Sequence, residues 1–246
     1  MNSGKRSNQQ NVDNMDLLTE KVTAFQPEYD PAETRLSISN QKQIKARGDE
    51  VLLGVNTAET ACNNSVSART DAFNTLDSLV TRALNALRIS DITEQTIDQG
   101  ASIVREIRNK RASGINPSVE VEEGTQPVEP VKSNKMHSGS FDAKIENFRR
   151  FIVLLSTIKA YRPKEPELMV DSLYAKLASL ILVNSTVKTA DARANAARTE
   201  RDVVLYAAKT GLVKIALDSK LYVKSAYGSR SSQYKSIGGI VFTTKK

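Results

Sequence analysis

Tryptophan is absent from the 246-residue sequence, and cysteine and histidine occur once each. A single cysteine, Cys62, excludes an intrachain disulfide, so nothing in the sequence favours an oxidising compartment. Zinc sites need several Cys or His side chains, and a Ser–His or Cys–His nucleophile needs a placed histidine base. The one histidine, His137, lies in a segment rich in Pro, Gly and Glu, where we expect it to be solvated. No metal ion and no other cofactor is therefore predicted.

Glycine-rich phosphate-binding motifs are also missing, since neither a Walker loop nor a G-x-G-x-x-G turn followed by a helix occurs. No stretch approaches the roughly 20 apolar residues that a membrane span needs. The polar N-terminus lacks the apolar region of a secretory signal. These absences predict a non-enzymatic protein that stays in the cytoplasm and does not span a membrane.

Acidic residues are scarce in the last fifth of the chain. Residues 203–246 hold eight Lys or Arg and a single acid, Asp218. The formal net charge of this segment is therefore +7, the same as that of the whole chain. Such a segment can attract phosphate backbones, so nucleic-acid binding is one alternative function. The other interpretation is a solvated helix face with a frayed end. We prefer it because the aromatic residues available there for stacking fall mostly on or near the helical seam.

What the sequence does contain is a repeat. Tyr29 and Pro31 return 132 positions later as Tyr161 and Pro163. Further matches at the same spacing are Glu33 with Glu165, Leu36 with Leu168, Val55 with Val187, Thr57 with Thr189, Ala58 with Ala190, and Arg69 with Arg201. We infer that one unit was duplicated: a short helix, a Tyr-x-Pro elbow and a long helix. Proline breaks a preceding helix, and we expect Pro31 at the first position of the next one.

Two very long helical patterns follow the elbows. Apolar or small residues recur every three or four positions over most of Ile44 to Leu87, and again from Leu173 to Ala226, where the helix should end at Gly228. That spacing is the seam of a coiled coil. The predicted fold is all-α, an elongated antiparallel helical bundle or coiled coil built from the duplication, with a short extended C-terminal arm.

Composition divides the chain into five predicted regions. Residues 1–12 form a disordered tail, 13–112 the first helical repeat with an extra helix, and 113–140 a flexible linker. Residues 141–228 form the second helical repeat, packed with the first as one domain. Residues 229–246 form a basic extended arm.

Charged residues interrupt both seams at matching positions. Arg69 matches Arg201, and Glu59 matches Asp191 ten residues earlier. If the long helices pair antiparallel about a pseudo-two-fold axis, Glu59 meets Arg201 and Asp191 meets Arg69. We hypothesise that these two pairs set the register, as polar seam residues do in coiled coils. Alternatively, the arginines reach solvent with only their stems buried.

Candidate interaction residues lie at the elbows and in the arm. They are Tyr29, Pro31, Tyr161 and Pro163 at the elbows, and Gln233, Tyr234, Lys235 and Phe242 in the arm. The elbows can instead simply reverse the chain, with the tyrosines closing one end of a bundle. The arm can instead pack locally.

Five segments carry a family resemblance. They are Tyr-Asp-Pro at 29–31, Leu-Val-Thr-Arg-Ala-Leu-Asn-Ala-Leu at 79–87, Glu-Asn-Phe at 146–148, Gly-Leu-Val at 211–213, and Ser-Gln-Tyr-Lys at 232–235. Together they resemble a family of all-helical proteins from Bacteroidota genomes for which no activity is established. That family has a Pro where Ser232 stands here. The resemblance implies an all-helical fold and leaves the function open.

The predicted function is therefore that of a structural or protein-interaction protein. It would act as a rod-like helical spacer or as a self-assembling component, with a protein as its partner, including a second copy of itself. One alternative is nucleic-acid binding through the basic C-terminal fifth. Another is a helical toxin or pore former, which the lack of a long apolar hairpin disfavours.

Overall fold

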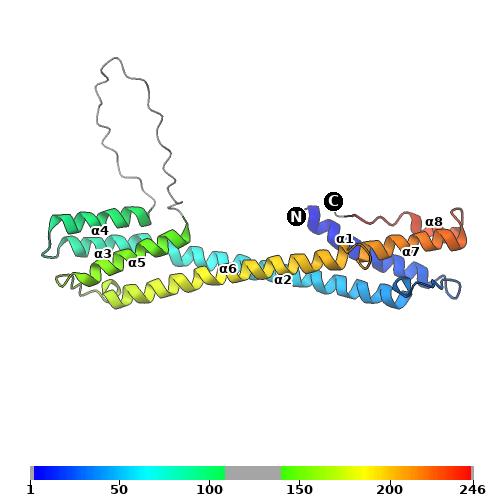
Figure 1. The fold of residues 1–246 in the computed structure, drawn as a ribbon, viewed down its shortest axis with the longest axis horizontal. Helices are drawn as coiled ribbons and strands as arrows, with labels where there is room; N and C mark the ends of the chain where they lie inside the picture. Colours follow the sequence, from blue (N-terminus) through cyan, green and yellow to red (C-terminus); the bar gives the residue numbers. More distant parts are fainter. Residues whose placement is uncertain (1–2, 109–139, 245–246) are drawn as a thin grey trace, which may run out of the picture. The chain divides into compact units, whose positions relative to one another are not determined.

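A computed structural model describes residues 3–108 and 140–244 of the chain, and within these ranges the regular elements are all helical. This confirms the predicted all-α class. The α-helices are α1 (Ser3–Thr23), α2 (Ile38–Asn74), α3 (Leu76–Arg88), α4 (Glu94–Ile107), α5 (Phe141–Thr157), α6 (Val170–Tyr206), α7 (Leu212–Tyr227) and α8 (Ser232–Gly238) (Figure 1). Two 3-10 turns, η1 (Thr34–Leu36) and η2 (Pro166–Leu168), precede α2 and α6.

The helices form two compact units whose boundaries fall inside α2 and α6. Unit 1 consists of Met1–Asn63 and Thr189–Lys246, and unit 2 of Asn64–Lys188. Unit 1 thus holds α1, η1, α7 and α8 with one part of each long helix, and unit 2 holds α3, α4, α5 and η2 with the other parts. Each unit contains pieces of both predicted repeats, which differs from the single domain expected for 13–112 and 141–228.

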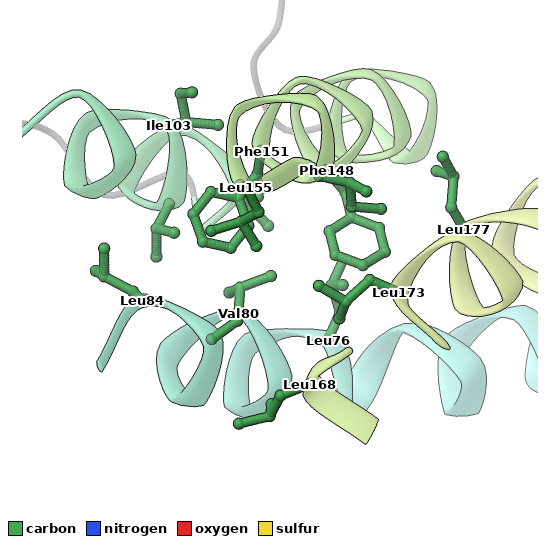
Figure 2. Close-up of a cluster of buried hydrophobic side chains, with 14 of the residues drawn as sticks. Leu76, Val80, Leu84, Ile103, Phe148, Phe151, Leu155, Leu168, Leu173 and Leu177 are labelled. Atoms are coloured by element: carbon green, nitrogen blue, oxygen red, sulfur yellow. The ribbon is translucent and has the colours of Figure 1, made fainter. Parts of the chain in front are cut away.

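Unit 2 is built around aromatic side chains of α5. Phe148, Phe151 and Leu155 are at most 1% exposed (Figure 2). Phe151 and Leu155 lie above Val80 of α3, and Phe148 lies near Leu76. Their spacing of three and four residues places them on one face of α5, and each such buried side chain contributes about 1.5–3 kcal/mol. Helix α4 packs closely on this core, since a Cβ at Gly100 would lie 2.8 Å from a methyl carbon of Leu87.

Unit 1 has a core of smaller side chains. Val12, Met15, Leu18 and Val22 are fully buried along one face of α1. The apolar residues of α7 that belong to the same cluster are Leu212, Val213, Ile215, Ala216 and Val223. Met15, Leu18 and Val22 recur at helical spacing, which places them on one face of α1.

The N-terminal tail was predicted wrongly. Residues 1–12 were expected to be disordered, but α1 begins at Ser3, and Asn8, Asn11 and Val12 are buried. The composition of the tail is polar, and polarity usually marks disorder. Here the side-chain amides of Asn8 and Asn11 are buried because they hydrogen-bond to distant parts of unit 1. This polar segment is therefore an ordered part of α1.

Both long helices are shorter than predicted. Helix α2 ends at Asn74, and α3 begins at Leu76. Residues 207–211 separate α6 from α7, so the helix expected to run to Gly228 is divided. Gly211 permits this turn, because a Cβ there would lie 2.5 Å from the backbone nitrogen of Ala207.

The C-terminal region is only partly extended. Residues 232–238, which include Gln233, Tyr234 and Lys235, form helix α8. Residues 229–231 form a turn before it, and the stretch from Gly239 to Thr244 after it is irregular. The Ser231 hydroxyl accepts a hydrogen bond from the Tyr234 amide and caps this helix. The predicted linker 113–140, except Ser140, and His137 lie outside the described residues.

Candidate functional site

The first elbow is closed by a tyrosine hydroxyl. Tyr29 is 4% exposed, and its Oη donates to the carbonyl of Leu36 at 2.8 Å. Its ring meets Tyr222 of α7 edge to face, with centroids 5.2 Å apart. Burial raises the pKa of Tyr29, while hydrogen bonds from Ser219 and Gln41 oppose the rise. The hydroxyl thus fixes the turn between α1 and α2.

A buried polar network surrounds this elbow. Gln41 is fully buried, and its Nε2 lies 2.8 Å from Tyr29 Oη, 2.8 Å from the Leu36 carbonyl and 3.2 Å from Ser219 Oγ. Its Oε1 lies 3.3 Å from Thr19 Oγ1. One amide therefore connects α1, η1, α2 and α7, and each of its polar atoms has a partner, as a buried amide requires.

The second elbow keeps the tyrosine and loses the network. Tyr161 Oη donates to the Leu168 carbonyl at 2.8 Å, over the same seven-residue separation as in the first elbow. Burial, aided by the charge of Glu165, raises the pKa of Tyr161 to about 12. The position that corresponds to Gln41 is Leu173, which is fully buried in the unit 2 core. The same backbone turn is thus packed with apolar side chains.

An ion pair also connects each elbow to a neighbouring helix. The elbow contributes the positive charge in unit 1 and the negative charge in unit 2. Arg35 of η1 lies 2.6 Å from Asp218 of α7, which also receives Lys214 at 2.8 Å. At the position corresponding to Arg35, Glu167 of η2 binds both terminal nitrogens of Arg82 of α3, at 2.8 and 3.2 Å. The Arg82 hydrogen bonds lower the pKa of Glu167. Both contacts connect the turn to the helix beside it.

The elbow prolines lie outside the helices. Pro31 was expected at the first helical position, but α2 begins at Ile38, after η1. The cap of α2 is instead Ser37, whose Oγ accepts from the Asn40 amide at 3.2 Å. Pro31 and Pro163 are both half-buried in the irregular stretches before η1 and η2. Their fixed φ suits these extended stretches.

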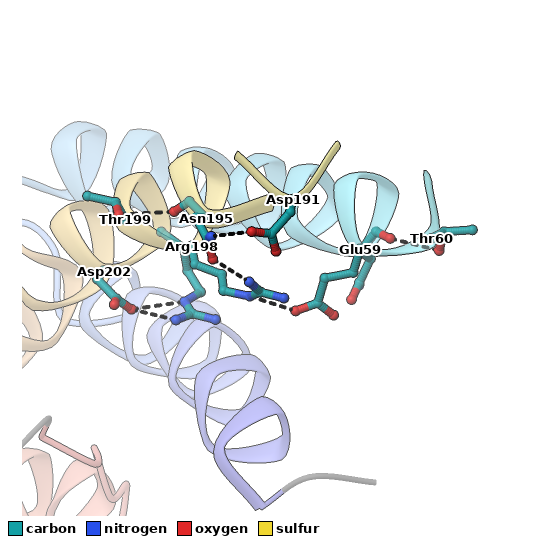
Figure 3. Close-up of polar contacts among 9 residues, drawn as sticks. Glu59, Thr60, Asp191, Asn195, Arg198, Thr199 and Asp202 are labelled. Atoms are coloured by element: carbon teal, nitrogen blue, oxygen red, sulfur yellow. Dashed lines mark hydrogen bonds and ion pairs between the residues drawn. The ribbon is translucent and has the colours of Figure 1, made fainter. Parts of the chain in front are cut away.

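The expected partner of Glu59 is corrected. Glu59 pairs with Arg198, whose Nε lies 3.1 Å from its carboxylate, and Arg198 also donates to Asn195 (Figure 3). Arg201 pairs with Asp202, the next residue in α6, at 2.7 Å. Because Asp202 satisfies Arg201 locally, the arginine one turn earlier meets Glu59.

The other two register residues have partners other than those predicted. Asp191 accepts a hydrogen bond from Asn195 at 3.2 Å. Arg69 donates to the buried Asn184 at 3.2 Å and lies 4.1 Å from the centroid of the Phe141 ring. Asp191 and Arg69 belong to different units, so their direct pairing stays a prediction. Arg69 is held by an amide and an aromatic face.

Residues that the sequence analysis passed over hold the end of the chain in place. Asn11 and Asn14 of α1 hydrogen-bond to the backbone of Thr243 and Val241. The spacing of Asn8, Asn11 and Asn14 at every third position was the available signal, since it marks one helix face. Phe242, a predicted arm residue, is 9% exposed and belongs to the unit 1 core.

Metal and membrane chemistry receive no support within the described ranges. Among residues 3–108 and 140–244, no three His, Cys, Asp or Glu side chains gather as a metal site would require. None of the helices in these ranges combines the length and the hydrophobicity that a bilayer crossing needs. Comparison with protein-family models, curated proteins and solved structures gives no significant match.

Proposed function

We propose that this chain is a non-enzymatic structural or protein-interaction protein, acting as a helical spacer or a self-assembling component. The observation that carries the proposal is the use of its buried polar side chains. Gln41 connects four elements around the first elbow, Asn11 holds the C-terminal residues, and Asn184 supports Arg69. In each case the polar group connects two elements within one unit. Such a structural use of buried polar groups is what we expect of a structural protein.

Internal duplication is part of this proposal. The two 3-10 turns and the two helices after them begin at the same 132-residue spacing, and α2 and α6 both have 37 residues. Both elbows use a Tyr hydroxyl bonded to a Leu carbonyl. We further propose that α2 and α6 pair antiparallel as a coiled coil, because each unit contains a contact between them, Glu59–Arg198 in unit 1 and Arg69–Asn184 in unit 2.

The nucleic-acid alternative is disfavoured by the contacts of the basic C-terminal residues. Lys214 pairs with Asp218, Lys220 donates to two backbone carbonyls, and Lys224 lies over the ring of Tyr234. These cations are committed to contacts inside unit 1, and a phosphate backbone would have to compete for them. Among the described residues, no contact favours the pore-former alternative.

Light scattering coupled to size exclusion, with small-angle X-ray scattering at low and high salt, tests the proposal. We expect a particle with an elongated scattering profile, either a monomer or a defined oligomer, whose mass is unchanged by salt. Pull-down with the chain as bait then seeks a protein partner. A chain that binds DNA or RNA with a steep salt dependence would contradict the proposal.

A further inference from the structure

The last described residues lie on α1 as an extended strand of chain would lie on a sheet edge. Asn11 Nδ2 donates to the carbonyl of Thr243 at 2.9 Å, and Asn11 Oδ1 accepts from the amide of Thr243 at 2.8 Å. One side chain thus satisfies both backbone groups of one residue, the exchange that two paired strand residues make. Asn11 is 1% exposed, so this contact is built into the fold.

Two further side chains bind the backbone of the same segment. Asn14, one turn along α1, donates to the carbonyl of Val241 at 2.6 Å. From α7, Lys220 Nζ donates to the carbonyl of Ile240 at 2.7 Å and to that of Gly238 at 3.1 Å. Burial lowers the pKa of Lys220. Contacts made to backbone atoms hold any extended chain, whatever its sequence.

Side chains of the segment alternate between buried and exposed. Ile240 is 7% exposed, Val241 is 67% exposed, and Phe242 is 9% exposed. Both buried residues belong to the unit 1 core. This alternation is the means by which extended peptides are selected: main-chain bonds supply affinity, and every second side chain fills a pocket.

Two glycines that the docked conformation does not require stand where α8 ends, Gly238 as its last residue and Gly239 directly after it. A Cβ on Gly238 or Gly239 would meet nothing within 4 Å. Gly239 has φ −77°, a value open to any residue. Two glycines without a steric task give the chain beyond α8 more freedom when it leaves its site, because glycine has the largest backbone entropy.

We infer that the surface formed by Asn11, Asn14 and Lys220 is a binding site for an extended segment with two buried apolar residues, filled here by residues 239–244 of the same chain. The occupant that we assign to it in an assembly is residues 239–244 of a second copy. A segment from a second copy makes the same contacts as the chain's own segment. The closed and exchanged forms therefore differ mainly in whether the segment is covalently linked to its site and in its effective concentration there. This inference rests on the proposed interaction function and names its site and partner.

Crosslinking between full-length chains tests the exchange. In a Cys62→Ser background, Asn14→Cys is placed in one chain and Val241→Cys in the other, and the mixture is treated with a short bis-maleimide. We expect covalent heterodimers, and their yield should increase with protein concentration. The segment of the second copy must compete with the chain's own segment, whose effective concentration at the site is about millimolar. A chain carrying both cysteines should crosslink within itself and report the closed form.

Matched substitutions show whether the heterodimers use this site. Phe242→Ser on the arm and Asn11→Leu on α1 should each lower the heterodimer yield about tenfold, since each removes a buried contact. The controls are Thr244→Ala and Gln10→Leu, at exposed positions on the same two elements, and they should leave the yield unchanged. Circular dichroism of each variant checks that the helices remain.

Either of two crosslinking results overturns the exchange. One is crosslinking confined to the double-cysteine chain at every concentration, and the other is heterodimer formation unaffected by Phe242→Ser and Asn11→Leu. An oligomer seen by light scattering that persists in these variants would overturn the exchange while leaving the proposed function in place. A chain that stays monomeric and binds no protein partner would overturn both.

Discussion

The two elbows make the same backbone turn with opposite interiors. In unit 1, Thr19, Gln41 and Ser219 surround the tyrosine–carbonyl bond with polar groups. At the positions that correspond to Gln41 and Ser219, unit 2 has Leu173 and Leu87, both fully buried. The turn therefore depends on the tyrosine bond that both elbows share, and its surroundings can be either polar or apolar.

The position of Thr19 follows the same pattern. The buried face of α1 matches that of α5 at a spacing of 133 residues, one more than in the elbows, with Met15 matched to Phe148 and Val22 to Leu155. At that spacing, the position that corresponds to Thr19 is Ile152. All three polar residues of one elbow are thus apolar in the other. A buried polar network is stable only when every member is paired, so its members are expected to change together.

The largest effect is expected from placing a glutamine in the apolar elbow. Leu173→Gln would bury an amide in unit 2. By analogy with Gln41, its nitrogen can reach the Leu168 carbonyl, but its oxygen would meet Ile152, where unit 1 has the hydroxyl of Thr19. We expect unit 2 to lose about 3 kcal/mol of unfolding free energy, from the unpaired oxygen and the lost apolar contacts. Urea unfolding followed by circular dichroism measures this.

A second-site change sharpens that result. Ile152→Thr in the Leu173→Gln background supplies the missing donor and should recover about 1 kcal/mol. Leu173→Met is the matched control, because it keeps the volume and should cost less than about 1.5 kcal/mol. If Leu173→Gln lowers the unfolding free energy no more than Leu173→Met does, polar and apolar residues can be exchanged singly at the elbow. That result would contradict the expectation that the members of the network change together.

The reverse change in unit 1 should cost less. In Gln41→Leu, Tyr29 still bonds to Leu36, and Thr19 still donates to the Met15 carbonyl at 2.7 Å. Ser219 loses its contact with Gln41 and keeps the one with Tyr29, so we expect a loss of about 1–2 kcal/mol in urea unfolding. Adding Ser219→Ala should reduce that loss, because it removes a buried hydroxyl that has lost one of its hydrogen-bond partners. A larger loss in the double variant would contradict the network.

Removing each tyrosine hydroxyl compares the elbows directly. Tyr161→Phe takes from the Leu168 carbonyl the donor that holds the turn, and we expect a loss of about 1 kcal/mol. Tyr29→Phe should cost less, since Gln41 still donates to the Leu36 carbonyl at 2.8 Å. Paired melting curves of the two variants check the order. Equal losses would mean that Gln41 does not compensate.

Alkaline pH gives the most selective difference. The pKa of Tyr161 is raised from 10.0 to about 12 in the folded chain. Its contribution to stability is complete below pH 10 and is lost as the pH rises through the folded value. We expect the unfolding free energy of wild type to fall between pH 10 and 12 more steeply than that of Tyr161→Phe. The same slope in both chains would show that Tyr161 is not involved.

Much of the fold could be predicted because the signals are local. Met15, Leu18 and Val22 recur at helical spacing and lie on the buried face of α1, and Ile145, Phe148, Ile152 and Leu155 do the same in α5. The Tyr-x-Pro elbows were also placed correctly as breaks before the long helices. Hydrophobic periodicity and proline act over one or two turns of chain, so the sequence reports them directly.

Partner choice could not be predicted in the same way. Glu59 was expected to meet Arg201, but Arg198, on the same side of α6, binds it, because Asp202 occupies Arg201. Gln41 was not recognised as a buried residue, because its partners come from α1, η1 and α7. A side chain with several acceptors in reach cannot be assigned from spacing alone.

The sequence by itself determined that the chain is helical, where its elbows lie and which apolar faces are buried, since these follow from interactions between near neighbours. Only the tertiary structure decided that the polar start of the chain is a helix and that residues 239–244 lie on it. Asn11 and Thr243 are joined by two hydrogen bonds across nearly the whole length of the chain. Contacts at that separation arise only when the helices between them have packed.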